Sequence, residues 1–216
     1  MLNDEYYKNV ERYLDAIKEC IEKTKGLAAE VIGENLIDLD LCFCSLMDRN
    51  IRLAQGFNLM IENRNLTCAG ALLRLQLDNC LRLYAINIAE DEKAIVDCLL
   101  KGEKICNLKD KSGKKMTDGY LKRLLSQYDE QFETVYDNTS GFIHFSEKAI
   151  YQSIYECEDM GIKFQVGGEL HEKRNKNIIE CASAFLHYYR LFLQFMMGEA
   201  DWKRAFDKSI KENKML

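Results

Sequence analysis

None of the 216 residues of the chain is a proline. Proline ends or kinks helices more strongly than any other residue, because its ring clashes with the preceding turn and removes an N–H donor. Without it, a helix can continue until a glycine or a polar cluster ends it. Hydrophobic residues make up 47% of the chain and charged residues 30%, which is typical of folded globular proteins. We therefore expect one mainly α-helical domain that spans residues 1–216.

Apolar residues that recur at three- and four-residue steps predict a bundle of five to seven helices. We expect Asn3 to cap the first helix, Gly26 to end it, and Gly198 to separate the last long helix from a short amphipathic tail. The third helix has apolar side chains almost all around its axis, which predicts burial on most sides. The predicted helices cover residues 3–25, 35–63, 66–89, 92–100, 118–136 and 173–197, and residues 137–141 end or interrupt the fifth.

The pattern changes from helical to alternating after His144. Residues 150–155 and 162–166 alternate between two faces, as strands do, and residues 159–161 between them have the composition of a turn. The sequence therefore predicts a small β-hairpin near residues 149–167 on a helical body.

The cysteines indicate a reducing compartment. Their number is nine, which is odd, and no Cys-x-x-Cys pair occurs, so we interpret them as free thiols of a cytoplasmic protein and expect no zinc site.

The first residues lack the basic start and apolar run of an export signal. The longest apolar stretch, residues 178–197, is interrupted by Glu180, His187 and Arg190, so we expect a core helix and no membrane-spanning segment.

Charge and motifs exclude several classes of function. A net charge of -5 does not attract the whole molecule to nucleic acid or anionic membranes, so an RNA or nucleotide ligand would need a local site. We interpret the lysine-rich residues 101–115 as a solvated loop. Phosphate-binding glycine loops, dinucleotide fingerprints, His-Glu-x-x-His and Gly-x-Ser-x-Gly are all absent from the sequence, so we expect neither a cofactor nor a metal.

Three charged residues lie on one stripe of the predicted third helix. Arg74, Asp78 and Arg82 follow one another at four-residue steps on a helix that is otherwise apolar. In one interpretation the two guanidinium groups bind a phosphate or carboxylate in a cleft, and Asp78 orients one of them. In the other interpretation the stripe forms ion pairs that only hold helices together.

A second group of polar residues surrounds His144. Asn138 and Ser140 precede this histidine and Ser146 follows it, at the predicted end of a helix. An imidazole beside hydroxyl and amide groups can act as a general base or acid near neutral pH. A histidine between apolar residues can equally be a hydrogen-bonded core or capping residue.

Two stretches carry a family resemblance. Residues 71–84, ALLRLQLDNCLRLY, resemble the "LLR..LE...R..Y" helix of a large group of bacterial proteins of unknown function, and residues 136–146, YDNTSGFIHFS, are similar to their "Y..LS.x.H.S" segment. That group looks like the HEPN-type helical proteins, which include RNA-cleaving toxins, defence factors and nucleotide-binding partners that dimerise through long helices. The resemblance implies a helical bundle that forms a homodimer, and in which the Arg74 helix and the His144 segment meet.

The chain departs from the active ribonucleases of that group. They place an arginine four to six residues before the histidine, whereas this chain has Asn138 six residues before His144 and no arginine in that window. Our leading hypothesis is therefore a binding module of defence or toxin-antitoxin type, in which the two polar groups receive an anionic, phosphate-bearing ligand. The alternatives are a metal-independent ribonuclease, with His144 as general base or acid and Arg82 on the phosphate, and a purely structural or interaction protein.

Overall fold

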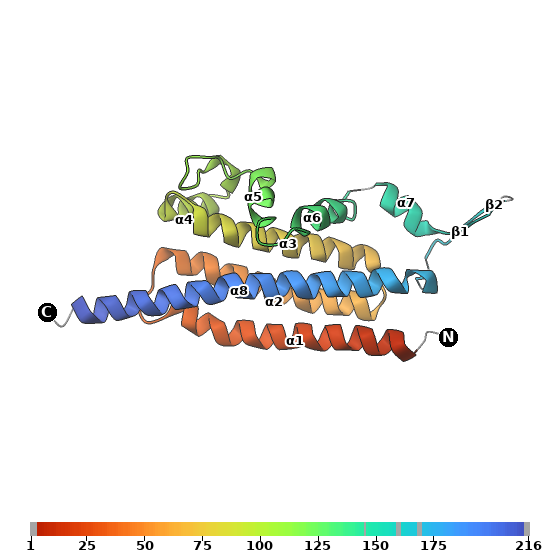
Figure 1. Ribbon diagram of the computed structural model, residues 1–216, viewed down its shortest axis with the longest axis horizontal. Coiled ribbons are helices and arrows are strands. Elements are labelled where there is room, and N and C mark those ends of the chain that lie inside the picture. Colours follow the sequence, from red (N-terminus) through yellow and green to blue (C-terminus); the bar gives the residue numbers. More distant parts are fainter. Residues whose placement is uncertain (1–3, 145, 159–160, 168–169, 214–216) are drawn as a thin grey trace.

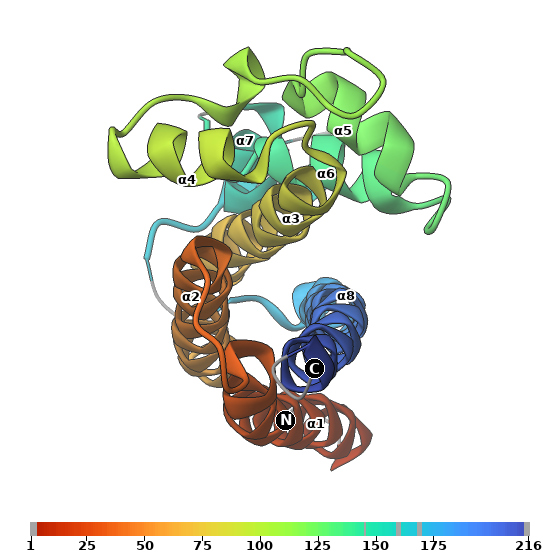
Figure 2. The ribbon, with the colours of Figure 1, turned by 90° about the vertical axis from the view of Figure 1, so that its left-hand side faces the viewer.

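The protein is a mainly α-helical bundle, as the sequence predicts (Figure 1). The computed structural model describes residues 4–144, 146–158, 161–167 and 170–213. Four long helices form the body, namely α1 (Asp4–Ile32), α2 (Asp38–Glu62), α3 (Leu66–Ile88) and α8 (Asn175–Asn213). Helix α1 packs on α2, α2 on α3, α3 on α8, and α8 on α1. Each long helix thus has two neighbours in a ring, which the end-on view shows (Figure 2).

The main core lies inside this ring. Phe57 of α2 stacks on Phe185 of α8 with 3.9 Å between the ring centroids. The hydroxyl groups of Thr24 on α1 and Tyr189 on α8 are hydrogen-bonded at 2.9 Å, so this buried polar pair is satisfied within the core. Helix α3 is buried on most of its surface, because it also carries an outer layer.

The outer layer consists of short elements that lie on the side of α3 away from α1 (Figures 1 and 2). They are α4 (Glu92–Leu100), the 3-10 turn η1 (Ile105–Asn107), α5 (Asp118–Leu125) and α6 (Phe132–Ser140). Helix α4 contacts α2, whereas α5 and α6 contact α3. This layer supplies a second set of side chains to the outer face of α2 and α3.

The expected hairpin is present but shorter than predicted. Strands β1 (Ile154–Glu158) and β2 (Gly161–Phe164) pair antiparallel, and the predicted turn residues Asp159 and Met160 lie outside the described residues. The prediction of a strand over residues 150–153 is wrong, because helix α7 (Glu147–Ser153) occupies them. A few alternating residues do not distinguish a strand from a single helical turn. A 3-10 turn, η2 (Glu172–Arg174), leads into α8.

Two glycines predicted to end helices lie inside them. Helix α1 passes Gly26 and α8 passes Gly198, because buried side chains such as Leu27 and Met196 continue the apolar face on both sides. The residue that follows α1 is Gly33, whose positive φ of 61° suits a glycine at a helix end. The predicted cap of α1, Asn3, lies outside the described residues.

The predicted helix over residues 118–136 is divided in two. Ser126 caps the end of α5 by donating its hydroxyl to the Lys122 carbonyl at 3.0 Å, and Asp129 accepts a hydrogen bond from the Gln131 backbone at 3.0 Å. Serine and aspartate side chains compete with the helical hydrogen bonds in this way. The described residues consequently contain eight α-helices, more than the five to seven expected. Residues 137–140, which were predicted to end or interrupt the helix, belong to α6, and this helix ends at Ser140, just before Gly141.

Within the described part of the chain, we find no helix with the length and apolar character that crossing a bilayer requires.

Candidate ligand-binding cavity

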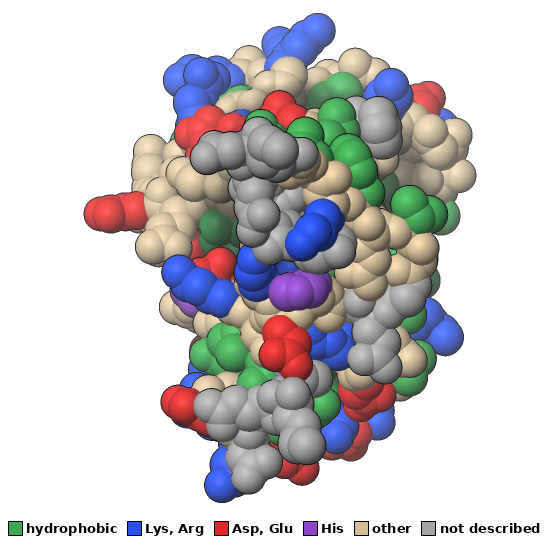
Figure 3. All heavy atoms as spheres, turned by 90° about the vertical axis from the view of Figure 1, so that its right-hand side faces the viewer, with side chains coloured by type: hydrophobic (Ala, Val, Ile, Leu, Met, Phe, Trp, Pro, Cys, Tyr) green, Lys and Arg blue, Asp and Glu red, His purple; other side chains and the backbone are tan. Residues whose placement is uncertain are grey.

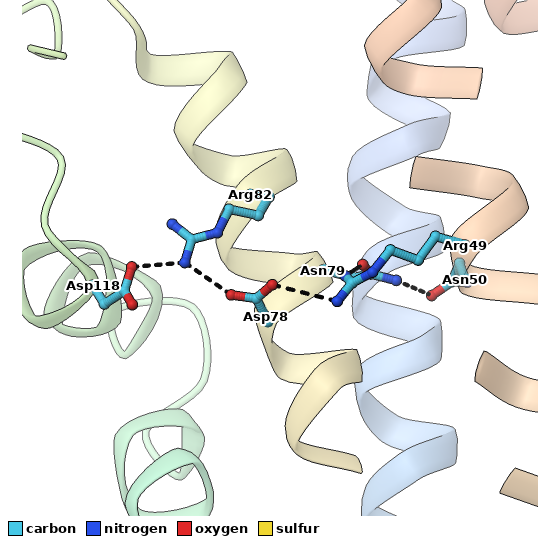
Figure 4. A network of polar contacts seen from close by, with 6 residues as sticks. All are labelled: Arg49, Asn50, Asp78, Asn79, Arg82 and Asp118. Atoms are coloured by element: carbon cyan, nitrogen blue, oxygen red, sulfur yellow. Dashed lines mark hydrogen bonds and ion pairs between the residues drawn. The ribbon is translucent and has the colours of Figure 1, made fainter. Parts of the chain in front are cut away.

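Arg82 of α3 is held by two carboxylates (Figure 4). Its Nη2 donates to Oδ1 of Asp78 at 2.9 Å and to Oδ1 of Asp118 at 2.8 Å. Asp78 lies one helical turn earlier on α3, and Asp118 is the first residue of α5, which Thr117 caps by accepting the Tyr120 backbone N–H. Burial lowers the pKa of the Arg82 guanidinium, but the two carboxylates outweigh burial and raise this pKa above its usual value.

A second arginine joins this network from α2. Nη2 of Arg49 lies 3.6 Å from Oδ2 of Asp78, and its Nη1 donates to the side-chain oxygen of Asn79. Asn79 in turn donates to Oδ1 of Asn50 at 3.4 Å. The network therefore connects α2, α3 and α5 and contains two guanidinium groups and two carboxylates, so that their charges balance (Figure 4).

The four charged side chains line a cavity of about 930 Å³ between α2, α3 and the outer layer. This volume lies in the range of sites that hold small molecules. The remaining lining includes one further carboxylate and one further amine, Glu103 and Lys104, whose charges also balance, and is otherwise mostly aliphatic. No aromatic side chain of the described residues contributes to it. The aliphatic residues include Leu41, Leu46, Ile86, Val96, Leu99 and Ile105.

Arg82 has donors left over for a ligand. Among the described residues, its hydrogen bonds all leave from Nη2, so Nη1 and Nε have no protein acceptor there. The side chain of Arg82 is 25% exposed and that of Asp118 is 47% exposed, so solvent reaches both. The arrangement thus presents a donor and an acceptor side by side in the lining of a mostly apolar hollow.

Arg74, the third residue of the predicted stripe, lies elsewhere. Its guanidinium carbon lies 3.5 Å from the ring centroid of Tyr136 on α6, and it is not among the residues that line the cavity. Its Nε is buried and has no hydrogen-bond partner among the described residues. Cation–π contact with an aromatic ring holds such a group without a carboxylate. Arg74 therefore ties α3 to α6, which is the structural interpretation of the stripe.

The His144 segment also meets α3 away from the cavity. Phe142 packs on Gly70, where an added Cβ would come within 2.5 Å of the ring. Gly70 precedes Arg82 by twelve residues, which corresponds to about 18 Å along a helix. The structure therefore brings the His144 segment to the Arg74 helix, but to its opposite end from Arg82.

The polar residues near His144 mainly complete the end of α6. The backbone N–H of His144 donates to the Ser140 carbonyl at 3.3 Å, and the Ser140 hydroxyl donates to the Tyr136 carbonyl at 3.1 Å. The Ser146 hydroxyl donates to the Gly141 carbonyl at 3.0 Å. Asn138 is exposed on α6, and neither it nor His144 lines the Arg82 cavity.

Sequence reasoning found Asp78 and Arg82 but missed Arg49 and Asp118. The four-residue step that reveals the stripe acts only within one helix, whereas Arg49 and Asp118 reach the site by the packing of α2 and α5. One signal was available for Asp118, because Thr117 followed by an acidic residue is typical of a helix start.

Comparisons with protein-family models, with curated proteins and with solved structures give no match to this chain. In the part of the chain that the structure describes, no three His, Cys, Asp or Glu side chains gather closely enough to hold a metal ion. The inference about function therefore depends on the geometry of the cavity.

Proposed function

We propose that the protein is a binding module that holds a small amphiphilic molecule in the Arg82 cavity. One observation carries this proposal: an arginine with unused donors and a partly exposed carboxylate lie side by side in the lining of a mostly aliphatic hollow of about 930 Å³. An aliphatic chain of the ligand would lie against Leu46, Ile86 and Val96. Its polar head would accept from Arg82 and donate to Asp118.

The balanced charges favour a head that both accepts and donates hydrogen bonds, such as an amide. The sequence predicts a phosphate-bearing ligand, but Asp78 and Asp118 already neutralise the two arginines. A phosphate would bring two more negative charges close to these carboxylates, and like charges at short distance repel. The described lining also contains no aromatic side chain, on which a nucleotide base would usually stack.

The setting that we propose follows the resemblance to HEPN-type proteins, which implies a defence or toxin-antitoxin module that acts as a homodimer in the cytoplasm. The eight described cysteines are free thiols, and this supports a reducing compartment. The position of His144 does not support the ribonuclease alternative, because His144 is not one of the described residues that line the Arg82 cavity.

Three eight-carbon probes with different heads test the proposal by isothermal titration calorimetry. We expect octanamide to bind more tightly than octanoate, and octyl phosphate to bind most weakly. Ser45 is exposed at the cavity, so Ser45→Trp should occupy part of the hollow and weaken octanamide binding without unfolding the protein. Failure of all three probes to bind, or unchanged binding by Ser45→Trp, would contradict the proposal.

A matched pair of arginine variants tests the role of Arg82. Arg82→Gln should weaken octanamide binding at least tenfold, because glutamine is shorter and lacks the guanidinium Nη1 and Nε donors that face the head position. Arg52 lies on the same helix as Arg49, pairs with Asp48 and does not line the cavity. Arg52→Gln should therefore leave the affinity unchanged, and equal losses in both variants would show that the effect is not local.

A further inference from the structure

Strand β2 and the residue pair that follows it present a row of large apolar side chains to solvent. Ile162 is 52% exposed, Phe164 is 59% exposed and Val166 is 97% exposed. Successive side chains of a strand point to opposite faces, so these three residues share one face. The hairpin projects from the bundle (Figure 1), on an end where hydrophobic side chains lie beside Lys and Arg side chains (Figure 3). An isolated two-stranded hairpin is only marginally stable in water.

The backbone of β2 offers hydrogen bonds at its outer edge. The N–H of Gln165 donates to the Ser153 carbonyl at 2.8 Å, so the backbone of Gln165 points toward β1. Backbone groups alternate in direction along an antiparallel strand, so those of Ile162, Phe164 and Val166 point away from β1. Within the described residues, β1 is the partner of β2 on one edge and no strand covers the other.

We propose that this edge pairs antiparallel with the same edge of a second copy of the chain. The pairing places Phe164 opposite Phe164 of the second copy, and Ile162 opposite Val166. These are the residues whose backbone groups face outward, so each opposed pair can exchange two hydrogen bonds. A two-fold rotation axis through Phe164 relates the two strands, and this is the symmetry of most closed homodimers.

The side chains fit the same register. On one face the pairing brings two copies of Ile162, Phe164 and Val166 together, and cross-strand aromatic and β-branched pairs stabilise sheets. On the other face it places Lys163 opposite Gln165, so that no two like charges meet. A register centred on Lys163 would instead set two lysines against each other, which is unfavourable.

The base of the hairpin is joined to the bundle, so that pairing of two hairpins also links two bundles. Arg174 donates from Nη2 to the Ile154 carbonyl at 3.2 Å, and Thr67 of α3 donates to the Gln152 side chain at 2.9 Å. A contact of three residues a side buries less than the roughly 1,200 Å² of a standard stable interface. The dimer is therefore expected to dissociate on dilution to micromolar concentration.

Engineered cysteines test the register. In a hydrogen-bonded antiparallel pair the Cα atoms lie about 5.5 Å apart, which a disulfide can span. Phe164→Cys should therefore give a disulfide-linked dimer under mild oxidation, with residue 164 joined to residue 164 in peptide mapping by mass spectrometry. Ile162→Cys is the control, because its two copies would lie about 14 Å apart. Equal cross-linking of both variants, or none by Phe164→Cys, would overturn the proposal.

Two charge variants test the contact without oxidation, by sedimentation velocity over a range of concentrations. Phe164→Lys places two positive charges opposite each other and should raise the dimer dissociation constant at least tenfold. Gln165→Glu places a carboxylate opposite Lys163 of the second copy and should lower it. Both substitutions lie at exposed or half-exposed positions, and circular dichroism should show an unchanged fold. A dissociation constant that neither variant changes would also overturn the proposal, whatever happens at the Arg82 cavity.

Discussion

At the scale of single residues, the most completely buried charges among the described residues are those of Lys203 and Asp40. Nζ of Lys203 lies 2.6 Å from Oδ2 of Asp40, and the two side chains are 1% and 2% exposed. Asp40 also accepts the Ile37 backbone N–H at 2.8 Å, at the start of α2. The pair therefore joins the far part of α8 to the turn between α1 and α2.

Lys203→Ala is expected to destabilise the protein by about 3–5 kcal/mol, because it leaves the Asp40 carboxylate buried without a cation. The measurement is urea denaturation followed by circular dichroism. Lys208→Ala is the control, since Lys208 forms an exposed pair with Glu212 at 3.9 Å, and such pairs contribute about 0.5 kcal/mol or less. Similar losses in the two variants would mean that the Asp40 pair is not stabilising the fold.

The hydrogen bonds of Asp110 predict that the free energy of unfolding depends on pH in the acid range. The Tyr120 hydroxyl donates to its Oδ2 at 2.6 Å, and Ser112 and the Lys114 backbone donate to its Oδ1, which together lower the pKa of Asp110 to about 2. A carboxyl group whose pKa is lower in the folded state stabilises the fold above its unfolded pKa of about 4. That contribution is lost as the pH falls from about 4 to about 2.

Asp110→Asn should accordingly reduce the slope of unfolding free energy against pH between about pH 4 and pH 2. Chemical denaturation at several pH values measures the slope. Asp97→Asn provides a comparison at a carboxylate on the exposed side of α4. A slope that Asp110→Asn leaves unchanged would show that these hydrogen bonds do not lower the pKa of Asp110.

At the scale of elements, three glycines show why helix ends are hard to predict. The sequence analysis takes Gly26 and Gly198 as helix ends and passes over Gly33, but of these three only Gly33 has a positive φ, which favours glycine. Contacts from outside the helix also favour glycine at this position, since the Asp207 carboxylate and the Lys203 side chain occupy the space where a Cβ would lie. Asp207 of α8, more than 160 residues later, also accepts hydrogen bonds from the backbone N–H groups of Glu34 and Asn35, so α8 holds the turn that follows α1.

Alanine substitutions distinguish these glycines. Gly198→Ala should stabilise the protein by about 1 kcal/mol, because alanine favours the helical backbone and nothing lies within 4 Å of the added Cβ. Gly33→Ala should destabilise it, because alanine resists positive φ and its Cβ would collide with the Asp207 carboxylate. Thermal unfolding measures both effects, and a shift of the same sign in the two variants would contradict this account.

The candidate site shows the same limit of sequence reasoning. Asp78 and Arg82 were predictable, because a four-residue step places them together on any helix. The surroundings of Arg74 were not predictable. Residues of the same stripe, about two helical turns apart, face the cavity at one position and the Tyr136 ring at the other. Which neighbour each residue of a stripe meets depends on where α5 and α6 lie, and the stripe itself does not contain that information.

At the scale of the whole molecule, the ring of long helices and the outer layer share α3, so we expect them to unfold together. Trp202 is the one tryptophan of the chain and lies on the far part of α8, where it stacks on Phe206 with 5.2 Å between ring centroids. Its fluorescence reports on that region, whereas circular dichroism reports on all helices. The two urea transitions should coincide, as in a two-state domain. Separate midpoints would show that the end of α8 unfolds independently.

The order of the helices in the ring has a consequence for how the protein emerges from the ribosome. Helices α1, α2 and α3 follow one another closely, whereas residues 89–174 separate them from α8, which contacts both α1 and α3. During synthesis, helices α1, α2 and α3 are thus complete early. More than eighty further residues are then synthesised before α8 begins. Throughout that interval Phe57 of α2 and Thr24 of α1 lack their partners on α8, Phe185 and Tyr189, so the core side of the three helices is open to a chaperone.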